Sequence, residues 1–234
     1  MSTVNRSIIT DGLVLCLDAA NPKSIISGST VWNDISRSGN NGILTNGPLY
    51  NSSNGGSIVF DGVDDFINLS SPKNLDLGTN NFTISVWLYL FGLPSGESYP
   101  NGYWVFGTGP QLSATDTQIF IGANRLHFDL NTDNGGPIDV NHGFIINNWY
   151  NIVISRIGNT FNAYKNGVLL QTATSVSSAV NGYNWAIGKP EPLPSGTIGY
   201  FYGKLQNFLV YNNKGLTTNE VLQNYNITKS RFGY

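Results

Sequence analysis

Residues 82–88 have the sequence Phe82-Thr83-Ile84-Ser85-Val86-Trp87-Leu88, in which apolar side chains occupy every second position. Successive side chains of an extended strand point to opposite sides of a sheet, so this period of two predicts a β-strand with one buried face. The face that we expect in the core carries Phe82, Ile84, Val86 and Leu88. The opposite face carries Thr83, Ser85 and Trp87, and we expect a second, wetter layer of packing there.

A meander of three antiparallel strands is predicted further along the chain, over residues 152–156, 160–165 and 168–172. The pairs Gly158-Asn159 and Asn166-Gly167 separate these strands. Asn-Gly is the preferred pair for a two-residue type I′ turn, because both central residues need a positive φ. The sequence therefore predicts a hairpin closed by Asn166 and Gly167.

Similar short segments recur between clusters of Gly, Asn, Pro and Ser, at residues 13–18, 57–60, 66–69, 104–107, 118–121, 125–129, 185–187 and 205–211. Such regular spacing is typical of a sandwich and not of alternating strands and helices. One helix is predicted near the C-terminus, where Thr217 and Glu220 have the spacing of a capping box. The predicted fold class is all-β, an antiparallel β-sandwich with a short C-terminal helix.

The bulk composition fits a single globular domain over residues 1–234, with 40% hydrophobic and 11% charged side chains. No internal repeat or linker of different composition divides the chain. Long loops rich in Gly, Asn and Ser are predicted near residues 51–56, 92–102, 131–143 and 191–199. Loops on a rigid scaffold are where binding residues usually lie.

Charge and apolar patterning exclude several classes of function. The net charge is −2 and no run of Lys or Arg occurs, so nucleic acid is not an expected partner. No stretch approaches the roughly 18 apolar residues of a membrane span, and residues 1–10 lack the apolar core of a signal peptide. We expect synthesis in the cytoplasm without a signal peptide. Cys16 is the single cysteine, which rules out a disulfide within the chain and favours a small buried side chain.

Four segments resemble laminin-G-like domains of the concanavalin A-like lectin and glucanase superfamily. They are residues 56–67 (Gly-Ser-Ile-Val-Phe-Asp-Gly-Val-Asp-Asp-Phe-Ile), 82–87, 149–167 and 203–221. Their order along nearly the whole chain is similar to that of the family. The resemblance implies a jelly-roll β-sandwich, but this fold supports many functions.

The two ends of the chain are similar to laminin-G-like proteins encoded among tailed-phage and environmental virion genes. The resemblance rests on residues 12–22, on Trp32-Asn33-Asp34 and residues 39–42, and on residues 221–226 and 231–233. It implies a non-enzymatic module on a virion surface, as a head decoration or fibre-associated adhesin. The implied partners are capsid or tail proteins, other copies of the chain, and host glycans. A free, extracellular lectin is the main alternative, and a divergent glycoside hydrolase is the third.

The catalytic pattern of the superfamily's glycosidases is missing. Retaining enzymes need two carboxylates about 5 Å apart, which the family carries on alternate positions of one strand. The chain has three glutamates, Glu97, Glu191 and Glu220, and none lies in such a strand. His127 and His142 have no Cys or acidic neighbour at the spacing of a metal site or triad. We therefore predict no enzymatic activity.

Laminin-G-like relatives often hold one calcium ion with oxygen ligands, and the resemblance points to Asp61, Asp64 and Asp65. A divalent cation would relieve the repulsion among three carboxylates in one turn. Tight turns also select Asp and Gly for their backbone hydrogen bonds, so a purely structural role stays open. The closing strand carries Gln206 and Asn207 where relatives carry acids, which makes Asn207 the candidate distal ligand. The expected cofactor is thus calcium or none.

Glycan binding would use exposed aromatic rings, which stack on sugars, beside amides and carboxylates that bind hydroxyl groups. Most tryptophans of a sandwich are core residues, and we expect this of Trp87 and Trp149. The candidates in or beside the predicted long loops are Tyr99, Tyr103, Trp104, Asp133, Asn134, Tyr183, Trp185 and Tyr200.

Overall fold

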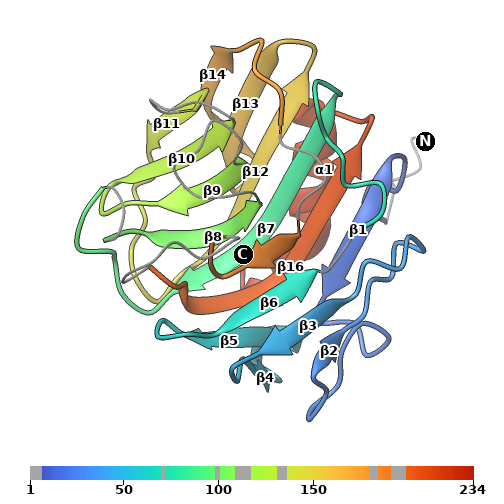
Figure 1. Ribbon diagram of the computed structural model, residues 1–234, viewed down its shortest axis with the longest axis vertical. Coiled ribbons are helices and arrows are strands. Elements are labelled where there is room, and N and C mark those ends of the chain that lie inside the picture. Colours follow the sequence, from blue (N-terminus) through green and yellow to red (C-terminus); the bar gives the residue numbers. More distant parts are fainter. Residues whose placement is uncertain are drawn as a thin grey trace.

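The computed structural model describes residues 7–69, 72–97, 101–108, 117–130, 136–179, 184–190 and 199–234. Two antiparallel sheets lie face to face over a common apolar core (Figure 1). We call them sheet A and sheet B.

Sheet A contains, in spatial order, β14 (Val168–Thr174), β13 (Thr160–Lys165), β12 (Trp149–Ile157), β7 (Phe82–Leu90), β16 (Tyr202–Asn212), β5 (Ser57–Asp61) and β4 (Leu49–Asn51). An eighth strand, β1 (Leu13–Asp18), pairs with the second half of β16. The long strand β16 therefore has β7 along one side and β5 followed by β1 along the other.

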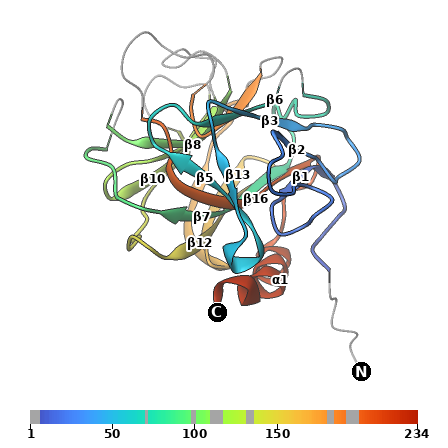
Figure 2. The same ribbon diagram turned by 90° about the horizontal axis from the view of Figure 1, so that it is seen from below.

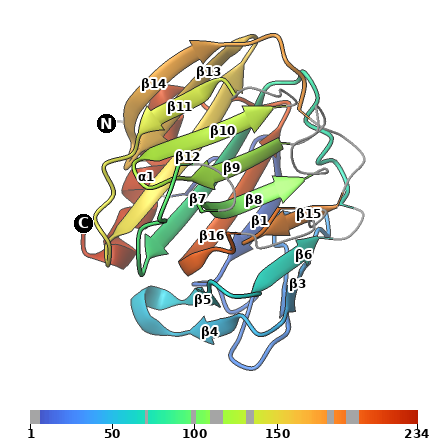
Figure 3. The same ribbon diagram turned by 60° about the vertical axis from the view of Figure 1, so that its left-hand side comes forward.

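Sheet B contains, in spatial order, β11 (Ile138–Asn141), β10 (Arg125–Leu130), β9 (Thr117–Ile121), β8 (Tyr103–Thr108), β15 (Trp185–Ile187), β6 (Phe66–Leu69), β3 (Gly42–Thr45) and β2 (Val31–Trp32). Figure 3 shows its central strands side by side in front of sheet A. The antiparallel pairing in both sheets confirms the predicted β-sandwich.

The core forms because alternate side chains of both sheets meet between the layers. Phe82, Ile84, Val86 and Leu88 are fully buried there, as predicted from their spacing. Burying one such side chain stabilises the fold by about 1.5–3 kcal/mol relative to leaving it exposed.

The helical part of the chain packs on the outer face of sheet A, and Figure 2 shows α1 below the strands. α1 (Thr218–Thr228) begins with the predicted capping box of Thr217 and Glu220, and the 3₁₀ helix η2 (Lys229–Phe232) follows it. Val221 of α1 packs in a second apolar cluster with Leu209, Tyr211 and Cys16. No helix in the described ranges is long and apolar enough to cross a bilayer.

The predicted strands and the Asn166-Gly167 turn are present, and both turn residues have positive φ values of 52° and 77°. Four short strands, β2, β3, β4 and β11, were not predicted, and β11 lies in a segment predicted to be a loop. A 3₁₀ helix, η1 (Ser53–Gly55), occupies part of another predicted loop. These four strands are short, and pairing with a neighbouring strand decides them.

Candidate functional site

The turn between β5 and β6 gathers three carboxylates. One carboxylate oxygen from each of Asp61, Asp64 and Asp65 lies within 4.8 Å of the corresponding oxygens of the other two residues. Asp61 Oδ1 accepts the backbone N–H of Val63 at 2.8 Å, and Asp65 Oδ2 accepts the backbone N–H of Asp61 at 2.9 Å. These bonds close the turn, so Asp61 and Asp65 are turn formers whether or not a metal binds.

The same carboxylates fit a hard cation. Burial raises the pKa of Asp65, and the charges of Asp61 and Asp64 raise it further. A bound cation would offset this repulsion. The turn bonds given above use Asp61 Oδ1 and Asp65 Oδ2, so the second oxygen of each carboxylate and the carboxylate of Asp64 are the oxygens that could bind a metal ion here.

Asn207 does not belong to this group. Its Oδ1 accepts the backbone N–H of Trp87 at 3.2 Å, and its partner in β1 is Asp18. The acidic turn instead lies at the start of β16, where Asp61 pairs with Tyr202. Five residues of extended strand, at about 3.3 Å each, place Asn207 roughly 16 Å further along β16. The prediction of Asn207 as a distal calcium ligand is therefore wrong.

Tyrosines surround the acidic turn. Tyr202 is 39% exposed and packs against Gly62, where a Cβ would lie only 2.9 Å from the Cβ of Tyr202. Burial raises the pKa of Tyr103, and the neighbouring Tyr202 raises it further. Burial also raises the pKa of Tyr200, with a smaller contribution from the charge of Asp64. Of the two predicted aromatic residues, Tyr200 is thus influenced by Asp64 of the acidic turn and Tyr103 by Tyr202.

From this end, outward side chains continue across the part of sheet A that the helices leave uncovered. One cross-strand row follows the register from β4 to β7, through Leu49, Val59, Lys204 and Tyr89. The row ends at Trp149 of β12, which is buried against Phe232 of η2. In the next row, the Phe91 ring lies 5.2 Å from that of Tyr202. We call this surface the open sector, defined by Leu49, Val59, Asp61, Tyr89, Phe91, Tyr202 and Lys204.

The sequence prediction missed most of the open sector. Tyr89 and Phe91 extend the outward positions of β7, and Lys204 shares the outward face of β16 with Tyr202. Continuing the alternation of residues 82–88 by two outward positions would have identified both aromatic rings.

Two predicted glycan contacts are corrected because their rings are buried. Trp104 is 1% exposed, donates from Nε1 to Gln118 Oε1 at 2.6 Å and packs on Phe120. Trp185 is 2% exposed and stacks on Phe106 inside the core, at 4.9 Å between centroids. Neither ring presents a face to a sugar, so both predictions are wrong. Four other predicted contacts lie outside the described residues: Tyr99, Asp133, Asn134 and Tyr183.

Glu97, Glu220 and His142 have structural partners, whereas Glu191 lies outside the described residues. Glu97 accepts the backbone N–H groups of Asn124 and Arg125, at 2.9 and 3.2 Å. Glu220 completes the capping box and bonds Lys214 at 2.6 Å. His142 is buried, and its Nδ1 accepts the N–H of Phe144 at 2.8 Å.

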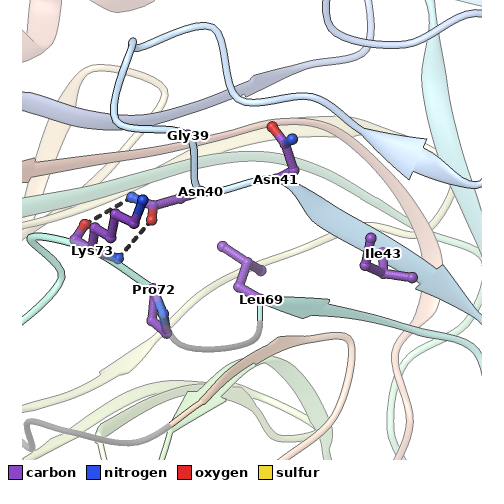
Figure 4. Close-up of a pocket in the computed structure, with 7 residues that line it drawn as sticks. All are labelled: Gly39, Asn40, Asn41, Ile43, Leu69, Pro72 and Lys73. Carbon is purple, nitrogen blue, oxygen red and sulfur yellow. Dashed lines mark hydrogen bonds between the residues drawn. The ribbon is translucent and has the colours of Figure 1, made fainter.

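A pocket of about 280 Å³ lies elsewhere, between the start of β3 and the segment after β6. Figure 4 shows the Asn40 amide facing the backbone of Lys73, to which it donates and from which it accepts a hydrogen bond, at 2.9 and 2.7 Å. Asn40 also donates to Val14 O at 3.0 Å. This amide is committed to holding two loops together, so the pocket offers a ligand fewer polar groups than its lining implies.

The laminin-G model of the concanavalin A-like lectin/glucanases superfamily matches residues 61–222. The chain belongs to this superfamily. This laminin-G-like domain thus has the fold expected from its sequence, including the signature turn at Asp61–Asp65. No curated protein matches its sequence.

Solved structures with the same fold include binding domains and parts of enzymes. The binding domain of paraclostridial mosquitocidal protein 1 has a TM-score of 0.72 at 16% identity, over 93% of this chain and 52% of that one. The botulinum neurotoxin serotype D binding domain has a TM-score of 0.68 at 14% identity, over 93% and 52%. The laminin-G-like domain thus spans about half the length of these toxin domains.

Domain 4 of the extracellular arabinanase AbnA from Geobacillus stearothermophilus, solved with arabinotriose, is similar over almost its whole length. Its TM-score is 0.66 at 17% identity, over 91% of this chain and 98% of that domain. Identities this low establish the shared fold alone.

Proposed function

We propose that this laminin-G-like domain is a non-catalytic carbohydrate-binding module and that the open sector is its contact surface. The observation that carries the proposal is the position of Tyr202, Phe91 and Tyr89 beside the exposed carboxylates of Asp61 and Asp64. Aromatic rings stack on the apolar faces of sugars, and carboxylates accept hydrogen bonds from sugar hydroxyl groups.

The fold supports this proposal, since binding domains and the arabinotriose-bound arabinanase domain share it. The structural roles of Glu97 and Glu220 support the absence of catalysis. A divergent hydrolase is the alternative, and turnover of a polysaccharide by the purified protein would establish it.

Binding at one site is expected to be weak, because a shallow surface buries little of a sugar and each contact must offset lost freedom of motion. Several copies on one particle would raise the retention on a glycan-coated surface through effective concentration. This expectation links glycan binding to the predicted virion surface location, which rests on the resemblance of the two ends of the chain. A cryo-EM map of the native assembly, with this domain assigned to a capsid or tail protein, tests that location.

The test of the proposed function is binding of a glycan panel by monomeric and multivalent wild-type protein, compared with Tyr202→Ala. Val176→Ala is the control, since Val176 is 80% exposed and follows β14 at the opposite edge of sheet A. We expect weak monomer binding, stronger multivalent binding, and loss of both in Tyr202→Ala alone. Absence of binding in both wild-type forms, or equal binding by Tyr202→Ala, would overturn the proposal.

We also propose that Asp61, Asp64 and Asp65 hold one calcium ion beside this surface. The ion would neutralise the carboxylates that raise the pKa of Asp65 and would stiffen the turn under Tyr202. EDTA should then lower the melting temperature of calcium-loaded protein, and Asp61→Ala should remove that sensitivity. Identical melting with and without EDTA, in protein shown to contain no metal, would leave the three acids as turn formers.

A further inference from the structure

Lys204 lies at the centre of the open sector. It is opposite Val59 on one side and Tyr89 on the other, and its side chain is on the same face as that of Tyr202. Its Nζ lies 4.9 Å from the Tyr89 ring centroid and 5.5 Å from that of Phe91. Attraction between the ammonium and these rings holds the charge over the aromatic surface.

Three other cations near sheet A have ion-pair or hydrogen-bond partners, whereas the Lys229 ammonium lies 5.4 Å from the centroid of the Tyr225 ring. Lys214 pairs with Glu220 at 2.6 Å, Arg231 pairs with Asp18 at 3.0 Å, and Lys165 donates to His142 O at 2.6 Å. Across the described ranges, Lys204 forms no ion pair and no hydrogen bond from its ammonium. Its N–H donors therefore stay available on a surface that also offers aromatic rings.

The local charges limit which anion fits. Lys204 supplies one positive charge, and Asp61 and Asp64 place exposed negative charges at the Tyr202 end of the same surface. A ligand with one negative charge near Lys204 and neutral hydroxyl groups near the aspartates satisfies both ends. The three carboxylates of the acidic turn outweigh the two positive charges of the proposed calcium ion, so a sulfated or phosphorylated polyanion would be repelled there with or without the ion.

We propose that the open sector selects saccharides that carry a carboxylate, and that Lys204 pairs with that carboxylate. This inference rests on the proposed glycan binding and names the ligand class. The sugar ring stacks on Tyr202 beside the inclined ring of Phe91, its hydroxyl groups face Asp61, and its carboxylate lies two residues along β16, about 7 Å away, at Lys204. Lys204 is thereby a specificity residue, while the rings supply affinity that does not depend on charge.

The experiment uses two matched pairs of probes that carry one carboxylate each: galacturonic acid with its methyl ester, and sialyllactose with its methyl ester. Binding to the full chain is measured by NMR titration at low and high salt, for wild type, Lys204→Gln and Lys23→Gln. Lys23 is exposed in the segment after β1, so Lys23→Gln matches the change in net charge. Equal melting temperatures of the three proteins exclude a folding effect.

For at least one pair, wild type and Lys23→Gln should bind the acid about two- to fivefold more tightly than the ester, which is the range of an exposed ion pair. High salt should reduce this preference, and Lys204→Gln should lose it while still binding the ester. Equal binding of acid and ester, or an unchanged preference in Lys204→Gln, would overturn the carboxylate assignment and leave glycan binding intact. Preference for a sulfated analogue would also overturn it. Absence of binding to both probe pairs and to the wider glycan panel would overturn the proposed function together with this inference.

Discussion

Trp87 and Tyr89 are successive outward residues of one strand, yet Trp87 is buried and Tyr89 is partly exposed. The Trp87 ring stacks on Phe232 at 4.1 Å and on Tyr225 at 5.7 Å, so it lies beneath the C-terminal segment. The Tyr89 ring contacts Trp149 and Phe91, its hydroxyl donates to Asn147 Oδ1 at 3.2 Å, and the Lys204 ammonium lies 4.9 Å from its centroid. The outer face of sheet A thus has a covered half and an open half.

The covered half exists because polar bonds fix the segments that lie on it. Asn224 of α1 donates to Tyr211 Oη at 3.1 Å and accepts the N–H of Ile9 at 2.8 Å, while Tyr211 donates to Ile9 O at 2.9 Å. This network joins the beginning and the end of the chain over β16. The comparison teaches that strand alternation decides which side chains face outward, whereas docking of distant segments decides which of them are covered.

The largest expected difference between the halves comes from truncating their aromatic residues. Trp87→Ala should destabilise the fold by about 3–5 kcal/mol, because it leaves a cavity beneath Phe232 and removes the Nε1 bond to Thr228. Tyr89→Ala should cost about 1 kcal/mol or less, as is usual for partly exposed positions. Urea unfolding measures both. Equal losses would contradict the division of the face into two halves.

The contact between the β13–β14 hairpin and α1 gives the next effect. Gly167→Val should cost about 1–3 kcal/mol, since φ is +77° and a Cβ would lie 3.1 Å from Leu222 and Tyr225. Gly158→Val is the control, because Gly158 has φ +60° with open space around it and so reports backbone strain alone. Thermal unfolding should rank Gly167→Val as the more damaging variant. An unchanged melting temperature for Gly167→Val would refute the role of this turn.

Thiol reactivity tests how firmly the covered half is closed. Burial, with smaller contributions from Asp18 and Asp34, raises the pKa of Cys16 to about 12, so the native thiol stays protonated and inaccessible near neutral pH. We expect negligible labelling of Cys16 by iodoacetamide between pH 7 and 9. Val59→Cys in a Cys16→Ser background should react readily and faster as the pH rises through the ordinary thiol pKa of about 8.5. Rapid labelling of native Cys16 would show that the covering segments open.

The smallest effect on stability is expected for Tyr202→Ala in the open half. Tyr202 is 39% exposed, so its removal should change the free energy of unfolding by less than about 1 kcal/mol. The same variant should lose saccharide binding. A large loss of stability would mean that Tyr202 holds the acidic turn in place and that its effect on binding is indirect.

The sequence predicted the sandwich strands well because their signals are local. The alternation of residues 82–88, the pair Asn166-Gly167 and the capping box at Thr217 each act within a few residues, and all three are present as predicted. The candidate site was predicted less completely. Tyr200 is influenced by Asp64 of the acidic turn and Tyr103 by Tyr202, whereas Trp104 and Trp185 are buried and Asn207 lies elsewhere on β16.

By itself, the sequence determined the fold class, the superfamily resemblance and the acidic turn, because periodicity and turn chemistry depend on neighbouring residues. Only the tertiary structure decided that Lys204 lies beside Tyr89 and Phe91, and that Trp87 is covered while Tyr89 is not. These relations depend on strand register and on where the C-terminal segment docks. Both are set by pairing and packing between residues far apart in the chain, which local sequence patterns do not encode.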